Sequence, residues 1–229
     1  MIRKNQTLAR VSLFRSLSKE EIAQLDARCV WRRAQEKECI LNYKDDSADI
    51  YFVAYGDVRV SIQSVAGKDL MLRVIKEGEF FGELSALDGK PRSAAIHAIT
   101  DTVIARMSPA IFREVIHHYP NVCDQVLETL TGEVRRLTTR VNEFTNLDVR
   151  GRIHAELLRL ARSDSGGENR GVISPVPTHA EIAARVSTHR EAVTRELNRL
   201  ERAGLLERRR GAFVLLDLAE LSASVEAAR

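Results

Sequence analysis

The chain has 229 residues, of which 44% are hydrophobic and 29% charged, and its formal net charge is +3. This length is sufficient for one large domain or two ordinary ones, and the composition is that of a folded globular protein. No apolar run approaches the ~18 residues that a membrane span requires. The N-terminus also lacks the apolar core and cleavage site of a secretion signal. We therefore expect a cytoplasmic protein that makes no membrane contact.

The three cysteines, Cys29, Cys39 and Cys123, are far apart in the sequence and odd in number. This spacing gives no metal-ligand cluster and favours a reducing compartment. We predict no metal site. Ordinary buried or surface thiols are the simpler interpretation, and thiol sensing is the alternative.

The first half of the chain combines short helices with short strands. Residues 8–28 have a helical pattern, in which Ser18 and Glu21 form a capping-box signature. Between residues 39 and 105 the pattern changes to alternating apolar positions separated by glycine-containing turns, such as Gly56-Asp57. Several short strands at regular spacing predict a small β sandwich or roll.

Residues 81–95, FGELSALDGKPRSAA, contain the residue types that a sugar phosphate requires. Arg92 offers a cation and Ser93 a hydroxyl donor for a phosphate, while small residues allow backbone N–H groups to approach it. Glu83 accepts hydrogen bonds only, which suits a sugar hydroxyl. This stretch alone predicts a ribose phosphate site, but a surface hairpin with a Glu83–Arg92 ion pair explains it about as well.

A long helix is predicted after Pro120. Its apolar residues follow steps of four and three that continue for about three heptads. These residues are Cys123, Leu127, Leu130, Val134, Leu137, Val141 and Phe144. Because a helix on a monomeric core usually has a wider apolar stripe, a two-helix dimer interface is favoured over simple core packing.

The C-terminal third has the pattern of a winged helix-turn-helix. Thr178 and Glu181 form a capping box on a first short helix, and a second helix is expected from Thr188 to Ala203. The inward positions of the two helices are apolar, and a hairpin turning at Arg210-Gly211 follows them. We expect Ile182, Ala183, Val186, Val193, Leu197 and Leu200 to form this core.

Positive charge is concentrated in the same third. Between Arg170 and Gly211 there are nine arginines and five glutamates, with no lysine or aspartate. Arg190, Glu191 and Arg195 have the side chains that read guanine and cytosine edges in a major groove. The simpler interpretation is a solvated helix face with a Glu191–Arg195 pair, but the capped helices, apolar pattern and basic hairpin together favour DNA binding.

With both motifs considered together, the chain resembles the catabolite activator / fumarate-nitrate regulator family of bacterial transcription factors. The resemblance depends on FGELSALDGKPRSA, the long helix, DVRGRI at residues 148–153 and HREAVTRELNRLE, in the family's order. It implies an α+β fold with three parts. These are a cyclic-nucleotide-binding β-roll like a jelly roll at 1–119, a coiled-coil dimerisation helix at 120–147 and a winged helix-turn-helix domain at 148–229.

The resemblance also implies a ligand site and a DNA surface. Cyclic AMP is the expected ligand, with cyclic GMP as the alternative, because Leu137-Thr138 replaces the activator's Thr-Ser pair beside the base. The expected ligand-binding residues are Gly82, Glu83, Leu84, Ser85, Arg92, Ser93, Ala94, Leu137 and Thr138. The expected DNA-binding residues are Thr178, His179, Thr188, His189, Arg190, Glu191, Thr194, Arg195, Arg209 and Arg210.

By the same resemblance, the protein would be a homodimer that binds a palindrome of TGTGA-like half-sites and contacts RNA polymerase, for which residues 164–171 are the candidate. Ligand binding would act through a hinge at residues 144–151. A ligand-independent or redox-controlled regulator with a vestigial pocket is the alternative. An enzyme is not expected, because no nucleophile–base constellation, phosphate-binding loop motif or metal triad follows residue 150, and no catalytic residue is predicted.

Overall fold

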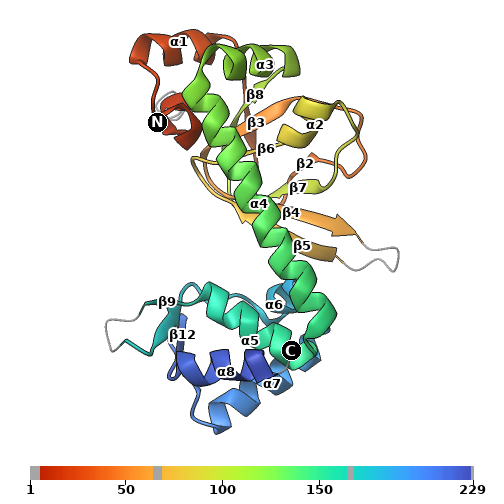
Figure 1. The fold of residues 1–229 in the computed structure, drawn as a ribbon, viewed down its shortest axis with the longest axis vertical. Coiled ribbons are helices and arrows are strands. Elements are labelled where there is room, and N and C mark those ends of the chain that lie inside the picture. The colour runs from red at the N-terminus through yellow and green to blue at the C-terminus, as the bar shows by residue number, and fades with distance from the viewer. Residues whose placement is uncertain (1–5, 64–68, 164–167, 228–229) are drawn as a thin grey trace. The chain divides into compact units, whose positions relative to one another are not determined.

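The computed structural model describes residues 6–63, 69–163 and 168–227 of the chain, which divides into two compact units, residues 1–132 and 133–229. Helix α4 (Pro120–Asn146) contributes to both units. The first unit contains the strands of a β-roll, and helices predominate in the second (Figure 1). No helix within the described ranges combines the length and the apolar character that crossing a bilayer demands.

The first unit is a roll of two antiparallel sheets. One sheet has the strand order β1-β8-β3-β6 and the other β2-β7-β4-β5. The strands are β1 (Val30–Ala34), β2 (Cys39–Leu41), β3 (Ile50–Tyr55), β4 (Val58–Gln63), β5 (Asp69–Ile75), β6 (Phe80–Phe81), β7 (Ala95–Ala98) and β8 (Thr102–Met107). The helices are η2 (Leu8–Arg10), η3 (Ser12–Phe14), α1 (Lys19–Ala27), α2 (Glu83–Asp88) and α3 (Pro109–His118).

Strand β3 is apolar along most of its length because both faces of its sheet are covered. Tyr51 and Val53 belong to the core between the two sheets. Ile50 and Phe52 alternate with them and pack instead in the core formed with η2, η3, α1, α3 and the start of α4. Successive side chains of a strand point to opposite faces, so a doubly covered strand needs an apolar run rather than an alternating pattern.

Helix α4 begins as part of the first unit. Val122 and Val126 are fully buried against the helical side of the roll. Neither residue belongs to the predicted seam, so the first part of the helix has a buried stripe that was not predicted. Further along, Leu127, Val134 and Val141 of the seam are more than half exposed. The seam therefore runs beside a second, buried stripe, and its residues Leu127, Val134, Leu137 and Val141 are left exposed.

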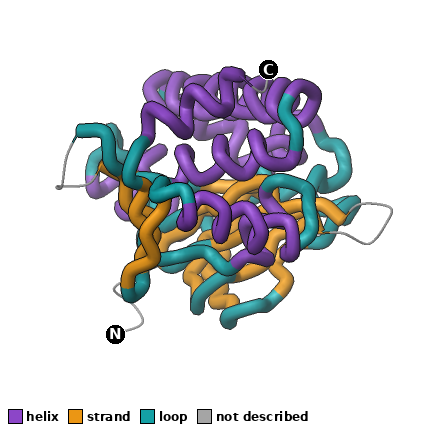
Figure 2. Tube along the Cα trace, turned by 90° about the horizontal axis from the view of Figure 1, so that it is seen from below, coloured by secondary structure: helices purple, strands orange, loops and turns teal. Residues whose placement is uncertain are grey.

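The second unit packs four helices and the end of α4 with a small sheet of order β11-β12-β10-β9. Figure 2 shows its helices in purple and its strands in orange. Its elements after α4 are α5 (Val149–Leu160), β9 (Arg162–Ser163), β10 (Gly171–Ile173), α6 (His179–Arg185), α7 (Arg190–Arg202), β11 (Leu206–Arg209), β12 (Ala212–Leu215) and α8 (Leu218–Ala227). The predicted core residues of the two central helices are all buried.

Most of the predicted elements are present, with differences at their ends. Both predicted capping boxes are formed, at Ser18 and at Thr178. The second helix of the helix-turn-helix begins at Arg190 instead of Thr188. Of the candidate polymerase-contact segment 164–171, residues 164–167 lie outside the described residues, and the last residue, Gly171, belongs to β10. Helix α8 was not predicted.

Candidate functional sites

The candidate ligand site is centred on helix α2, which was not predicted from the sequence. Gly82, at φ +84°, ends the short strand β6 and precedes the helix, and Gly89, at φ +71°, ends it. Glu, Leu and Ala between these glycines favour a helix over an open turn. Gly82 offers no side-chain cap. The backbone N–H groups of the first turn, which have no intrahelical partner in any helix, therefore receive no side-chain acceptor from that residue.

Arg92 lies beneath this helix, and its side chain is buried. It is only 3% exposed. Its Nε donates to Ser47 Oγ at 3.0 Å, its Nη2 to Asp49 O at 2.8 Å and its Nη1 to Gly82 O at 3.2 Å. The guanidinium also lies 5.7 Å from the centre of the Tyr51 ring. These contacts hold it in one orientation next to the start of α2.

The charge of Arg92 is not neutralised by a direct ion pair with any carboxylate among the described residues. Its three hydrogen bonds go to neutral oxygen atoms. A guanidinium has five N–H donors and stays charged in proteins, which leaves two donors for another acceptor. Burial lowers the pKa of Arg92, against the opposing influence of Tyr51 and Asp49. A buried cation without an anion is costly, and the arrangement suits an anionic ligand.

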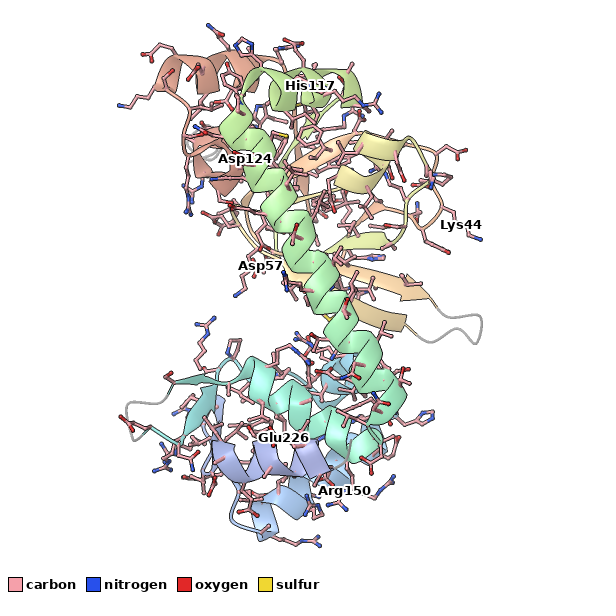
Figure 3. The ribbon with its side chains drawn as sticks, viewed as in Figure 1. Lys44, Asp57, His117, Asp124, Arg150 and Glu226 are labelled. Carbon is pink, nitrogen blue, oxygen red and sulfur yellow. The ribbon has the colours of Figure 1, made fainter. Side chains whose placement is uncertain are left out.

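Gly82 is required at this position by space as well as by backbone conformation. A Cβ on residue 82 would lie 2.7 Å from Arg92 Nη1 and 2.9 Å from Asp49 O. The absence of a side chain therefore allows the guanidinium to approach the chain reversal before α2. The loop around Lys44, labelled in Figure 3, is joined to the backbone of Arg92 by two hydrogen bonds. Lys44 N–H donates to Arg92 O at 3.0 Å, and Arg92 N–H donates to Asp45 O at 2.9 Å.

The other predicted ligand residues differ in their exposure. Ser93 is exposed beside Arg92, and Leu84 is 47% exposed on α2. Ser85 and Ala94 are buried. These positions belong to the first unit, and their contact with a ligand stays a prediction.

Leu137 and Thr138, predicted to lie beside the base, belong to the second unit. Both are exposed on α4. The Thr138 hydroxyl donates to the carbonyl of Val134 at 2.9 Å, so it serves the backbone of its own helix. Their role at the ligand site stays a prediction.

The candidate DNA surface is formed by α6, α7 and the β11–β12 hairpin. Arg190, Glu191 and Arg195 are exposed on the first half of α7. In the described part of the chain, no ion pair joins Glu191 to Arg195, so the intrahelical pair considered as the simpler interpretation is absent. All three side chains are accessible to a partner.

The two helices are joined by a polar contact as well as by their apolar core. His179 Nδ1 lies 2.8 Å from Thr194 Oγ1, and the Thr194 hydroxyl lies 3.0 Å from Arg190 O. Burial is the main cause that lowers the pKa of His179, and the positive charges of the nearby Arg208 and Arg190 lower it further. His179 and Thr194 therefore support the placement of α7 through contacts within the chain.

The turn and the hairpin place the remaining predicted residues near α7. Thr178 is the N-cap of α6, His189 is the N-cap of α7, and Thr188 lies half-buried in the turn before it. On the hairpin, Arg209 pairs with Glu207 at 2.9 Å, and Arg210 is exposed at the turn. The three arginines 208–210 give this hairpin a basic tip.

Two buried polar clusters of the second unit were missed. In one, Glu156 on α5 and Glu143 on α4 are contacted by three arginines. In the other, His154 on α5 contacts Glu196 on α7. The sequence contains one signal for the second cluster. Glu196 lies three residues after Val193 and four before Leu200, which puts a glutamate on the apolar side of the helix.

Two of the three cysteines, Cys29 and Cys39, do not have the lowered pKa that favours a reactive thiol. All three are free thiols. Burial raises the pKa of Cys29 to about 12, and burial also raises the pKa of the exposed Cys39. Because the thiolate is the reactive form, these shifts work against the redox alternative. The described ranges also contain no group of three or more His, Cys, Asp or Glu side chains placed to hold a metal ion.

Comparison with known families finds one matching domain family for each of the two units. The family "Cyclic nucleotide-binding domain" matches residues 31–119, and the family "Crp-like helix-turn-helix domain" matches residues 151–224. A nucleotide-binding β-roll followed by a winged helix-turn-helix defines a class of DNA-binding transcription regulators.

Two curated relatives and one solved structure that are similar to this chain are described as transcriptional regulators. The cAMP-activated global transcriptional regulator CRP of Salmonella typhimurium is 28% identical over 181 residues, which is 79% of this chain and 86% of the relative. The cAMP-activated regulator Vfr of Pseudomonas aeruginosa is 28% identical over 191 residues, covering 82% and 89%. A CRP-family regulator from Thermus thermophilus aligns with a TM-score of 0.65 at 27% identity, covering 85% of this chain and 96% of that one.

The fold is also shared with a solved structure of lower sequence identity. A mutant of CooA from Carboxydothermus hydrogenoformans has a TM-score of 0.81 at 21% identity, and covers 95% of this chain and 98% of that one. The chain belongs to the catabolite activator / fumarate-nitrate regulator family. With a cyclic-nucleotide-binding domain and a DNA-binding helix-turn-helix domain, this chain is a transcription regulator of that family and not an enzyme.

Proposed function

We propose that this protein is a transcription regulator whose DNA binding is controlled by a cyclic nucleotide held at Arg92. The observation that carries the proposal is the buried guanidinium beside α2, which has spare donors and no paired carboxylate among the residues that the structure describes. A cyclic phosphate supplies the missing anion and accepts charge-assisted hydrogen bonds from a fixed arginine. Ser93 would add a hydroxyl donor, and Glu83 would accept from the ribose.

Cyclic AMP is the proposed ligand, because the relatives that cover most of the chain are described as cAMP-activated. Cyclic GMP is the competing ligand, since Leu137-Thr138 offers one hydroxyl to the base where the activator has two. A further competitor is c-di-GMP, because a regulator from Xanthomonas campestris with the same fold is described as responsive to it. The three ligands share a phosphodiester and differ in their bases and size.

On DNA, we propose a homodimer that binds a two-fold palindrome with TGTGA-like half-sites. The exposed Arg190 and Arg195 would donate to guanine edges, and Glu191 would accept from a cytosine amino group. Arg209 and Arg210 would contact phosphates, which hold the register without reading sequence. We assign residues 1–119 to ligand binding, 120–147 to dimerisation and 148–229 to DNA binding. The polymerase contact is proposed at residues 164–171.

The proposed control is a shift between two states of the dimer. A ligand that binds one state more tightly favours that state, and its coupling to DNA must be reciprocal. Such coupling is typically about 1–3 kcal/mol, which is roughly 5–150-fold in affinity. The end of α4 and the start of α5, at residues 144–151, would carry the change.

A gel-shift titration tests this function directly. The protein is titrated onto a TGTGA palindrome at fixed salt, without ligand and with cyclic AMP, cyclic GMP or c-di-GMP, because phosphate contacts make every affinity salt-dependent. We expect cyclic AMP to increase affinity roughly 5–150-fold, and a scrambled palindrome to show no such increase. Equal affinity in all four conditions would overturn ligand control and favour the ligand-independent alternative.

The exposed seam of α4 predicts a dimer that a charge disrupts. Val134 and Val141 are 63% and 65% exposed, although both are apolar. Val134→Asp should therefore shift the protein from dimer to monomer at micromolar concentration, because a buried unpaired carboxylate is costly. Thr139→Asp, which lies two residues before Val141 and so on the opposite side of the helix, is the control. Light scattering that gives the same mass for both variants would contradict the assignment of the seam.

A further inference from the structure

Ser47 lies beside the Arg92 guanidinium but comes from outside residues 81–95, where the phosphate contacts were predicted. It belongs to the loop between β2 and β3, and it is exposed. Its Oγ accepts a hydrogen bond from Arg92 Nε at 3.0 Å. A buried arginine therefore has an exposed hydroxyl as one of its three hydrogen-bond partners.

Hydrogen bonds on both sides of Ser47 hold its loop against the segment that carries Arg92. Before Ser47, the amide of Lys44 donates to Arg92 O, and the amide of Arg92 donates to Asp45 O. After Ser47, the carbonyl of Asp49 accepts from Arg92 Nη2 at 2.8 Å. None of these contacts uses the Ser47 side chain. A substitution at position 47 should therefore leave the loop in place and change only the hydroxyl.

The Ser47 hydroxyl can donate a hydrogen bond while it accepts one from Arg92. A serine hydroxyl has one proton and two lone pairs, and the bond from Nε occupies one lone pair. Among the described residues, no acceptor takes the proton of this hydroxyl. A hydroxyl that accepts from a cation is polarised and becomes a stronger donor. Ser47 thus offers an exposed donor next to a buried positive charge.

The remaining donors of Arg92 are close to this hydroxyl. Each terminal nitrogen of a guanidinium has two N–H groups. Nη1 uses one of them for Gly82 O and Nη2 uses one for Asp49 O, so one N–H remains on each. The group is planar and compact, and Ser47 is bonded to its third nitrogen. A phosphodiester has two non-bridging oxygens, so one can accept from the guanidinium while the other accepts from the hydroxyl.

We propose that Ser47 is a phosphate-binding residue of the ligand site, whose hydroxyl donates to one of the two non-bridging oxygens of the cyclic nucleotide. The inference rests on the proposed function, because it requires a cyclic phosphate at Arg92. It adds a donor from the β2–β3 loop to the donors that Arg92 and Ser93 provide. The bound phosphate then bridges two segments of the roll that are far apart in the sequence.

Calorimetry on the full-length protein with cyclic AMP tests this contact. Ser47→Ala should bind cyclic AMP on the order of tenfold more weakly than the wild type, which is the usual worth of one hydrogen bond to a charged group. Ser47→Thr keeps the hydroxyl and should recover most of the loss. The matched control is Thr100→Ala, which also removes an exposed hydroxyl of the roll that accepts one hydrogen bond, here from the amide of Asp57 at 3.1 Å. This control should bind like the wild type, and thermal melting shows whether each variant is folded.

A second measurement separates a direct contact from an effect that acts through Arg92. In each of the two phosphorothioate diastereomers of cyclic AMP, sulfur replaces one non-bridging oxygen, and sulfur is the weaker hydrogen-bond acceptor. If the hydroxyl donates to one of these oxygens, Ser47→Ala should weaken binding of one diastereomer about tenfold and of the other hardly at all. A serine that only orients Arg92 would give the same loss with cyclic AMP and with both diastereomers.

Equal losses with all three ligands would overturn the direct contact. The same conclusion follows if Arg92→Ala weakens cyclic AMP binding while Ser47→Ala does not, or if Thr100→Ala loses as much affinity as Ser47→Ala. If the wild type does not bind cyclic AMP, or if Arg92→Ala binds it equally well, the proposed function fails and this inference fails with it.

Discussion

Arg92→Ala should reduce the affinity for the cyclic nucleotide on the order of 10²-fold or more and abolish ligand-stimulated DNA binding. Each hydrogen bond to a charged group contributes about 1.5–3 kcal/mol, and the guanidinium has two N–H donors beyond those bound to Ser47, Asp49 and Gly82. Calorimetry with cyclic AMP measures the first effect, and the gel shift measures the second. Arg92→Lys should recover only part of the affinity, because an ammonium lacks the planar fork of arginine.

Arg106→Ala is the matched control for this experiment. Arg106 is also an arginine of the β-roll, and its Nη1 lies 3.6 Å from Asp49 Oδ2, but its side chain is 47% exposed. We expect this variant to bind the ligand like the wild type. DNA affinity without ligand and the thermal melting of Arg92→Ala show whether the roll stays folded. A folded Arg92→Ala variant with unchanged ligand affinity would show that the phosphate binds elsewhere.

Glu156→Gln should destabilise the second unit by about 3–5 kcal/mol, the cost of removing one partner from a buried ion pair. Glu156 is 2% exposed. Its two oxygens contact arginines from three helices, with Arg140 and Arg185 both at 3.2 Å and Arg159 as the third. The amide keeps the shape of the side chain but removes the charge. Glu143 would then be the remaining carboxylate of the cluster for three arginine charges, and it contacts only two of these arginines.

Urea unfolding followed by two signals measures this effect. Trp31 is the single tryptophan and belongs to the first unit, so its fluorescence reports on the roll. Circular dichroism also follows the helices of the second unit. We expect the helical transition to move to lower urea by more than about 1 M, for a slope of about 1–3 kcal/mol per M. The Trp31 transition should stay in place.

Glu201→Gln makes the same chemical change in an exposed pair. Glu201 lies 3.3 Å from Arg208, and both side chains are more than a third exposed. Exposed pairs contribute about 0–1 kcal/mol, so this variant should unfold like the wild type. Equal shifts in the two variants would show that the cluster around Glu156 does not stabilise the unit.

The sequence was sufficient to predict those elements whose determining contacts are local. The helix-turn-helix was predicted correctly because Thr178 and Glu181 cap the first helix within one turn, and apolar residues repeat at helical spacing in both helices. Helix α2 was missed because its six residues are too few to establish a period. The two valines at the start of α4, Val122 and Val126, were missed because a regular seam beside them explained the same helix.

The buried charges were not predictable in the same way. Glu196 meets His154 across 42 positions of the chain, and Glu156 meets Arg185 across 29. A single charged residue on an apolar helix face marks an irregularity, but its partner is defined only by the tertiary fold. The sequence predicted Arg92 as a cation for a phosphate, whereas its burial against Ser47 and Asp49 required the roll itself.

The two backbone hydrogen bonds between the Lys44 loop and Arg92 also determine how this region exchanges its amide protons with solvent. The amides of Lys44 and Arg92 are both bonded, each to the other segment. Neither amide proton can exchange until the Lys44 loop separates from the segment before β7 that carries Arg92. Their exchange rates therefore report the local opening free energy of the ligand site, and bound nucleotide should slow both amides together.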